Sequence, residues 1–135
     1  MIRKSFVIPS ESKYLKPLRT KLLQFLKKTG HLSKNRDAFL IAISEACTNS
    51  IRHAYSGENN HKIHVTVEDS KFRTVFRIRD YGRKIDLAKV KPPELPPTKP
   101  HGLGIHFIKT MMDGVKYNTA HRRGNELILI KYKIK

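Results

Sequence analysis

Apolar and polar residues alternate at the start of the chain, from Ile2 to Ile8, and Pro9 ends the alternation. Alternation with a period of two is typical of a strand, and proline cannot donate a hydrogen bond to a sheet. Beyond Ser12, large apolar residues recur at helical spacing until Gly30, which predicts an amphipathic helix. These residues are Tyr14, Leu15, Leu18, Leu22, Phe25 and Leu26.

A second helix is predicted from about Lys34 to Tyr55, with the Ser33 hydroxyl as its cap and Gly57 just beyond its end. On a helical wheel, bulky residues fall on one side, and small residues surround two polar ones on the other. The bulky side has Phe39, Leu40, Ile43 and Ile51, and the small side has Ala38, Ala42 and Ala46 around Glu45 and Asn49. A helix that is apolar almost all round is buried. A carboxylate and a carboxamide on that surface indicate a site with room for a ligand, or else two polar groups that hydrogen-bond within a core.

Two further alternations predict an antiparallel hairpin, with strands at Ile63–Val67 and Phe72–Ile78. The hairpin places Asp80-Tyr81-Gly82 at the end of a strand. There the glycine allows the backbone to approach a ligand closely, and the carboxylate can accept a hydrogen bond from an amine. Taken alone, this short sequence is equally typical of a turn.

Five prolines lie between Lys89 and Pro100, so neither a helix nor a paired strand is expected there. Because this loop runs directly into Gly102-Leu103-Gly104, we interpret it as a lid of about residues 89–101. The glycines precede an apolar helix, Ile105–Met112, and free amides at a helix start can hold a phosphate group. A simple turn from loop to helix is the alternative.

A closing hairpin is predicted from Val115–His121 and Glu126–Ile134. Together the elements predict one domain, residues 1–135, with an α+β fold. We expect a two-layer sandwich in which a mostly antiparallel sheet is covered on one face by the three helices. The chain has no apolar run of about 18 residues and no signal-peptide pattern, so we expect a cytoplasmic protein without a membrane span. The single cysteine, Cys47, is interpreted as a small buried apolar residue.

The chain is strongly basic, with 28 lysines and arginines against 11 acidic residues and a formal net charge of +17. Such a charge suggests an acidic partner, nucleic acid or an anionic surface. The basic residues are spread along the whole chain, and no helix-turn-helix, zinc finger or aromatic RNA-binding strand accompanies them. This argues against direct nucleic-acid binding but leaves it open.

The order of the motifs resembles that of the GHKL, or Bergerat-fold, ATPases. It runs from the Glu45 and Asn49 pair through Asp80-Tyr81-Gly82 to Gly102-Leu103-Gly104. The Ser-Glu-Ala-Cys-Thr-Asn run at 44–49 and the His-Ala-Tyr that follows resemble more closely the bacterial anti-sigma-factor serine/threonine kinases. A dinucleotide-binding site is not indicated, because Phe107 stands in place of a third glycine, and a P-loop lysine motif is missing.

The resemblance implies ATP and Mg²⁺ as cofactors and gives roles to particular residues. Glu45 is then the general base and Asn49 the Mg²⁺ ligand, while Asp80 reads the adenine amino group and Gly82 lines the adenine pocket. Further nucleotide contacts are implied for His53, His101, Gly102, Leu103, Gly104 and Ile105.

The implied activity is phosphorylation of a serine or threonine on an anti-anti-sigma protein of the STAS type. A sigma factor is the second implied partner, sequestered when the acceptor is phosphorylated, and a homodimer is expected. Two departures concern the glycine motifs: Lys84 replaces the second glycine of the first, and His101 precedes the second. A catalytically weak ATP-binding regulator of the same fold, and a basic nucleic-acid-binding regulator, remain alternatives.

Overall fold

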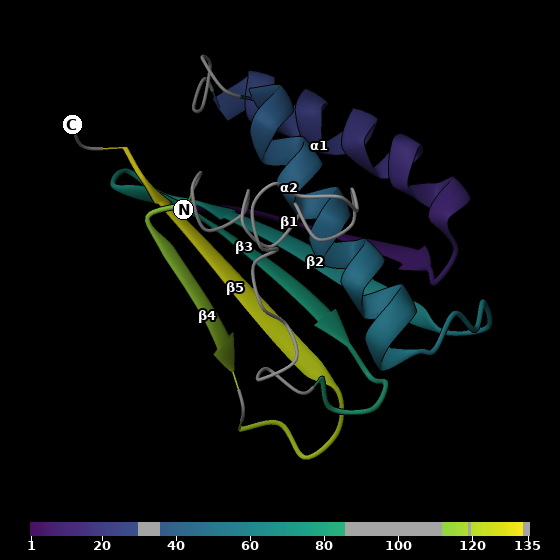
Figure 1. Cartoon of the computed structure of the whole chain (residues 1–135). Helices are drawn as coiled ribbons and strands as arrows, with labels where there is room; N and C mark the ends of the chain where they lie inside the picture. The colour runs from purple at the N-terminus through teal and green to yellow at the C-terminus, as the bar shows by residue number, and fades with distance from the viewer. Residues whose placement is uncertain (30–35, 86–111, 119, 134–135) are drawn as a thin grey trace, which may run out of the picture.

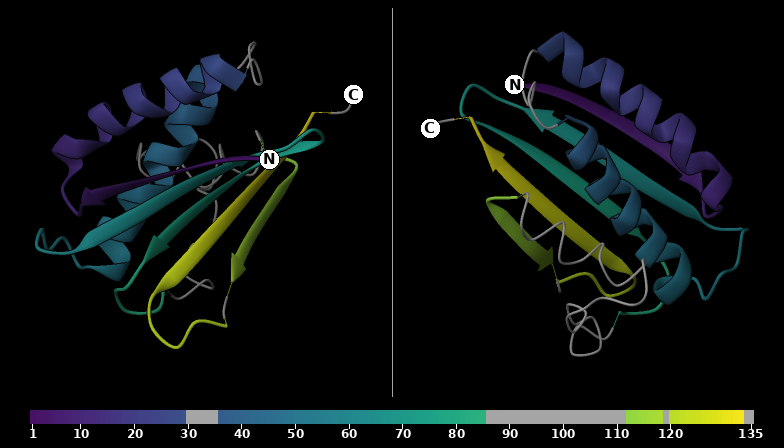
Figure 2. Two further views of the ribbon diagram at one scale, coloured as in Figure 1. Left: turned by 180° about the vertical axis from the view of Figure 1, so that it is seen from behind. Right: turned by 45° about the horizontal axis from the view of Figure 1, so that its top comes forward.

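The computed structural model describes residues 1–29, 36–85, 112–118 and 120–133. Its elements, in chain order, are β1 (Ile2–Pro9), η1 (Ser12–Tyr14), α1 (Leu15–Thr29), α2 (Arg36–Asn49), η2 (Ser50–Ala54), β2 (Lys62–Asp69), β3 (Arg73–Asp80), β4 (Gly114–Asn118) and β5 (Asn125–Tyr132). The strands form one antiparallel sheet in the order β1-β2-β3-β5-β4. Both α-helices lie on one face of this sheet (Figures 1 and 2). The predicted α+β two-layer sandwich is confirmed.

The core lies between the sheet and the two helices. Alternate strand residues face the helices and are almost fully buried, as the period of two predicts. They include Ile63, Val65, Val67, Phe76, Ile78, Leu127 and Leu129. From α1, the leucines at helical spacing are buried against them: Leu15, Leu18, Leu22 and Leu26. The amphipathic pattern of this first helix therefore correctly predicted its core face.

The central helix differs from the prediction at its C-terminal end. The α-helical part stops at Asn49, and residues Ser50–Ala54 form a π-helix, η2, in which the Tyr55 amide donates to the Ser50 carbonyl over 3.0 Å. Gly57, with a φ of 78°, then ends the segment. Residues 34 and 35 of the predicted helix lie outside the described residues. Single π-helical turns are frequent at functional sites because they re-aim the residues around them.

The last hairpin is also shorter than predicted. Strand β4 ends at Asn118 rather than His121, because the Asn118 side chain accepts a hydrogen bond from the Ala120 amide and turns the chain away from the sheet. Strand β5 ends at Tyr132. The predicted lid, 89–101, lies outside the described residues, as does the predicted Ile105–Met112 helix except for Met112. Among the described residues, no helix is both long and apolar enough to cross a membrane.

Candidate functional site

Asp80, the last residue of β3, is completely buried, and only one of its two carboxylate oxygens has hydrogen-bond partners among the described residues. Oδ1 accepts hydrogen bonds from the Gly82 amide (3.1 Å), the Asn125 amide (3.2 Å) and the Asn125 side chain (3.0 Å). Oδ2 is buried and has no partner among the described residues. A buried carboxylate oxygen without a donor is costly, so this position suits the N–H group of a ligand.

Asn125, which the sequence reasoning did not single out, is the residue that fixes Asp80. Besides its bonds to Asp80, its side-chain amide donates to the Arg83 carbonyl (3.0 Å) and accepts from the Ile85 amide (2.9 Å). Asn125 lies opposite Asp80 in the β3–β5 register. Asn125 therefore orients both the Asp80 carboxylate and the segment that follows β3, through Ile85. The only sequence signal was its place directly after Gly124, in the turn just before the predicted strand Glu126–Ile134.

Gly82 is needed because the end of β3 packs directly on the end of η2. A Cβ atom at Gly82 would lie 2.3 Å from the Ala54 carbonyl oxygen. The same oxygen accepts a hydrogen bond from the Arg83 amide (3.0 Å), and the Tyr55 hydroxyl accepts one from the Tyr81 amide (2.7 Å). These contacts join the C-terminal end of the central helical segment to the Asp80 corner.

Glu45 and Asn49 lie on α2, one helical turn apart, on the face predicted for them. Asn49 is the last α-helical residue and is buried, and its Nδ2 has no partner among the described residues. Glu45 is half-buried and forms no hydrogen bond or ion pair with any described residue. The neighbouring Ala42 and Ala46 are both buried. The alternative that Glu45 forms hydrogen bonds within the core therefore has no support in the described part of the chain.

The remaining predicted site residues are not gathered around Asp80 in the described structure. His53 is exposed on η2, and its carbonyl oxygen accepts a hydrogen bond from the Arg83 side chain (3.3 Å). His101, Gly102, Leu103, Gly104 and Ile105 lie outside the described residues. Their nucleotide contacts stay predictions.

Burial raises the pKa values of Cys47, Tyr55 and Tyr117, which lie near α2 and the sheet. Burial first, and then the negative charge of Asp80, raises the pKa of the Tyr117 hydroxyl. Burial raises the pKa of the Cys47 thiol to about 12. Cys47 is completely buried, so it is protonated near neutral pH and unsuited to act as a nucleophile. Its interpretation as a small buried apolar residue is confirmed.

A comparison with protein families matches residues 8–131 to the histidine kinase-like ATPase domain. The chain belongs to this ATPase family. The resemblance that its motifs indicate is thereby confirmed. Similar proteins include the serine-protein kinase RsbW of Bacillus velezensis, 29% identical over 93% of this chain and 82% of the relative. The RsbW of Bacillus licheniformis is 31% identical over 79% of this chain and 72% of the relative.

The geometry around Asp80 fits the adenine nucleotide that this ATPase family implies. The unpaired Oδ2 of Asp80 can accept a hydrogen bond from an exocyclic amino group. At Asn49, rotation of the amide exchanges its nitrogen and oxygen, so the side chain can offer a donor to a phosphate or an oxygen to a cation. Two buried polar atoms that have no partner among the described residues thus have the chemistry that nucleotide binding requires.

Proposed function

We propose that this protein is an ATP-dependent serine/threonine protein kinase. The observation that supports this best is the buried Asp80 carboxylate, held rigidly by Oδ1 and unpaired at Oδ2, in a chain of the histidine kinase-like ATPase family. Such a carboxylate distinguishes an adenine amino group from the carbonyl of guanine, because the carbonyl would face it as a second acceptor.

Within this proposal, α2 supplies the residues for chemistry. Glu45 serves as the general base that accepts the proton of the acceptor hydroxyl, and Asn49 holds Mg²⁺. Phosphoryl transfer depends mainly on positioning the reactants and on stabilising charge, so a carboxylate and a metal ligand one turn apart on a rigid helix suit it. When bound, ATP with Mg²⁺ supplies the transferable phosphoryl group.

The proposed partners follow the serine-protein kinases to which the chain is similar. We propose a small anti-anti-sigma protein of the STAS type as the acceptor and a sigma factor as the sequestered partner, with the kinase acting in the cytoplasm as a homodimer. Strand β1 lies at one edge of the sheet, and a groove of about 980 Å³ runs between it and α1. This edge offers a surface for a second protein chain.

The test is transfer of a labelled γ-phosphate from ATP to a protein in a nucleotide-depleted extract of the native cells. With wild-type protein, we expect one small acceptor to be labelled on serine or threonine. With Glu45→Gln, transfer should fall about 10²- to 10⁴-fold while calorimetric binding of ATP is retained. Asn49→Ala should lose affinity in Mg²⁺ but change little in chelator.

Two outcomes would contradict the kinase proposal. Undiminished transfer by Glu45→Gln would remove the proposed base and make Glu45 a structural carboxylate. ATP binding without any labelled acceptor would instead indicate the ATP-binding regulator of the same fold.

A further inference from the structure

The sheet has a second face, opposite the helices, which the other described elements leave uncovered (Figure 2). We call it the open face. In the register of the strands, one row across it is Val7, His64, Arg79, Glu126 and Asn118. The next row is Ser5, Thr66, Arg77, Ile128 and Lys116. The following row is Arg3, Glu68, Val75, Ile130 and Gly114. Charged, polar and apolar side chains are thus mixed on the open face, whereas the helix-covered face is mainly apolar.

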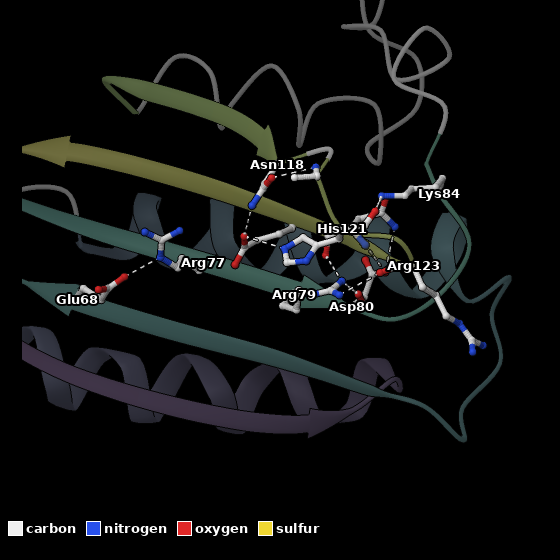
Figure 3. A network of polar contacts seen from close by, with 11 residues as sticks. Glu68, Arg77, Arg79, Asp80, Lys84, Asn118, His121 and Arg123 are labelled. Carbon is white, nitrogen blue, oxygen red and sulfur yellow. Dashed lines mark hydrogen bonds and ion pairs between the residues drawn. The ribbon is translucent and has the colours of Figure 1, made fainter.

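Positive charge dominates this surface. The strands contribute Arg3, Arg73, Arg77, Arg79 and Lys116, and the adjoining loops contribute Lys84, Arg122 and Arg123. The two carboxylates on the open face are already engaged (Figure 3). Glu68 pairs with Arg77 at 2.6 Å, and Glu126 accepts from Asn118 at 3.0 Å and lies 3.1 Å from His121. Arg79, Lys84 and Arg123 donate hydrogen bonds to backbone carbonyl oxygens. Those carbonyls carry no net charge, so the positive charge of these side chains is not neutralised and still attracts anionic groups.

An exposed aromatic ring lies at one end of the open face. The Tyr81 ring is 44% exposed. The Arg79 guanidinium lies 4.3 Å from its centre, and His64 packs edge-on at 5.5 Å. Tyr81 also borders a cavity of about 380 Å³ whose lining includes Arg83, Lys84, Arg122 and Arg123. An aromatic platform thus adjoins a pocket lined by four cations.

We infer that the open face binds single-stranded RNA. Phosphates would lie against the cations, and a base would stack on Tyr81, as in other single-strand-binding surfaces. Eight-residue strands make the face about 26 Å long, which accommodates a few nucleotides. A sheet of five strands is too wide to enter the grooves of a duplex as a helix or a two-stranded ribbon does. An anionic membrane is disfavoured because Val7 is the only apolar residue of these rows that is more than half exposed.

RNA is favoured over single-stranded DNA by the neutral and acidic groups between the cations. The Ser5 and Thr66 hydroxyls are hydrogen-bonded to each other at 3.3 Å, and Glu126 and Asn118 lie one and two strands from Arg79. The Ser5 and Thr66 hydroxyls keep a further lone pair each, and neither bond to Glu126 uses its Oε2, so these oxygens can accept from a ribose 2′-hydroxyl, which DNA lacks. The carboxylate repels the phosphates of both kinds of strand, but only the 2′-hydroxyl of RNA can offset this with a hydrogen bond.

The strands of the open face lie across the sheet from the Asp80 carboxylate, although the cavity beside Tyr81 is also lined by Gly82, which belongs to the Asp80 corner. Asp80 is fully buried between the sheet and the helical layer, whereas Arg79, its neighbour on β3, belongs to the opposite face. RNA binding can therefore be tested without assuming the kinase activity.

The experiment uses fluorescence anisotropy with a labelled oligouridine of about 12 nucleotides, titrated with the whole protein at several salt concentrations. We expect affinity to fall steeply with salt. Lys116→Glu combined with Arg122→Glu should weaken binding at least tenfold and reduce the salt slope by about 1.4. Tyr81→Ser should weaken binding roughly tenfold, and Tyr81→Phe, which keeps the ring, should not.

Matched controls separate this surface from total charge. Lys16→Glu with Lys21→Glu makes the same charge change on exposed positions of α1, in the helical layer, and should cost little affinity. Thermal unfolding should confirm that each variant is folded. Binding weakened equally by the α1 control and by the open-face variant would overturn the proposal, as would binding of oligothymidine or polyglutamate as tight as that of oligouridine. No binding of RNA at about 50 mM salt would overturn it outright.

Discussion

At the scale of single residues, the most informative contrast is between the two oxygens of Asp80. Oδ1 accepts three hydrogen bonds, whereas Oδ2 accepts none from the described residues. The motif could be read from the sequence because Asp-x-Gly has a fixed spacing. The role of Asn125 could not be read from the sequence. It depends on the pairing of β3 with β5, which places Asn125 opposite Asp80, 45 positions earlier in the chain.

Asp80→Asn should weaken ATP binding about 10- to 150-fold, because a charge-assisted hydrogen bond contributes roughly 1.5 to 3 kcal/mol. ATP should also bind the wild-type protein much more tightly than GTP. Titration calorimetry with both nucleotides measures this. Asp113→Asn, which changes an exposed carboxylate at the start of β4, is the control and should bind ATP normally. Unchanged ATP affinity in Asp80→Asn would remove Asp80 from the site.

Cys47 should be inert toward thiol reagents in the folded protein. Its thiol is completely buried, and the raised pKa of about 12 keeps it protonated at pH 8. Unfolding restores an ordinary thiol, so the reaction should become fast in denaturant. Absorbance with a chromogenic disulfide reagent, with and without urea, measures the contrast. Rapid reaction of the native protein would indicate a reactive cysteine instead.

At the scale of elements, the periodicity of the sequence correctly predicted which faces of α1 and the strands are buried. It could not predict where elements end, because those limits depend on local side-chain hydrogen bonds and on packing between distant segments. Asn118 ends β4 by bonding to the Ala120 amide, and the π-helical turn at Ser50–Ala54 brings the Ala54 carbonyl against the loop after β3.

Gly82→Ala should destabilise the contact between η2 and the end of β3. An added methyl would lie 2.3 Å from the Ala54 carbonyl oxygen, so the backbone must shift at a cost of about 1 to 3 kcal/mol. Because the Gly82 amide also bonds Asp80, ATP affinity should fall as well. Urea unfolding and calorimetry measure the two effects. Gly114→Ala is the matched control, since its added methyl would meet Ile130 at an ordinary 3.4 Å.

The β4–β5 hairpin should contribute a pH-dependent part of the stability through Glu126. Burial by itself would raise the pKa of the Glu126 carboxyl. Hydrogen bonds from His121 and Asn118, with the positive charges of His121 and Arg77, outweigh burial and place it below the ordinary 4.5. Because the folded pKa is the lower one, the stabilisation is present above about pH 4.5 and is lost as the pH falls through the folded value.

Glu126→Gln should therefore lower the free energy of unfolding near pH 7, and its stability curve should approach that of the wild type in acid. Urea unfolding across this pH range measures the difference. Glu11→Gln, which removes an exposed pair with Lys13 at 3.8 Å, should have little effect. Parallel curves for the wild type and Glu126→Gln would show that the carboxylate does not contribute in this way.

At the scale of the whole molecule, the two faces of one sheet have separate roles in our proposals. The helix-covered face contains the Asp80 carboxylate, and the open face presents the arginines and lysines. The sequence revealed the total charge of +17 but not its arrangement, because strand order determines which basic residues become neighbours. The sequence shows no strand with the aromatic residues that are typical of RNA-binding sheets. Tyr81 escaped notice because it lies just after β3 rather than within it.

The pairing of β3 with β5 also has consequences for how fast the molecule folds and unfolds. Asp80 meets Asn125 only after a chain loop of more than 40 residues has closed, which is slower than forming the local β2–β3 hairpin. If that closure comes late in folding, a nucleotide that recognises the finished Asp80 corner cannot accelerate folding. It would instead lengthen the lifetime of the folded state, so stopped-flow measurements should find its effect in the unfolding rate.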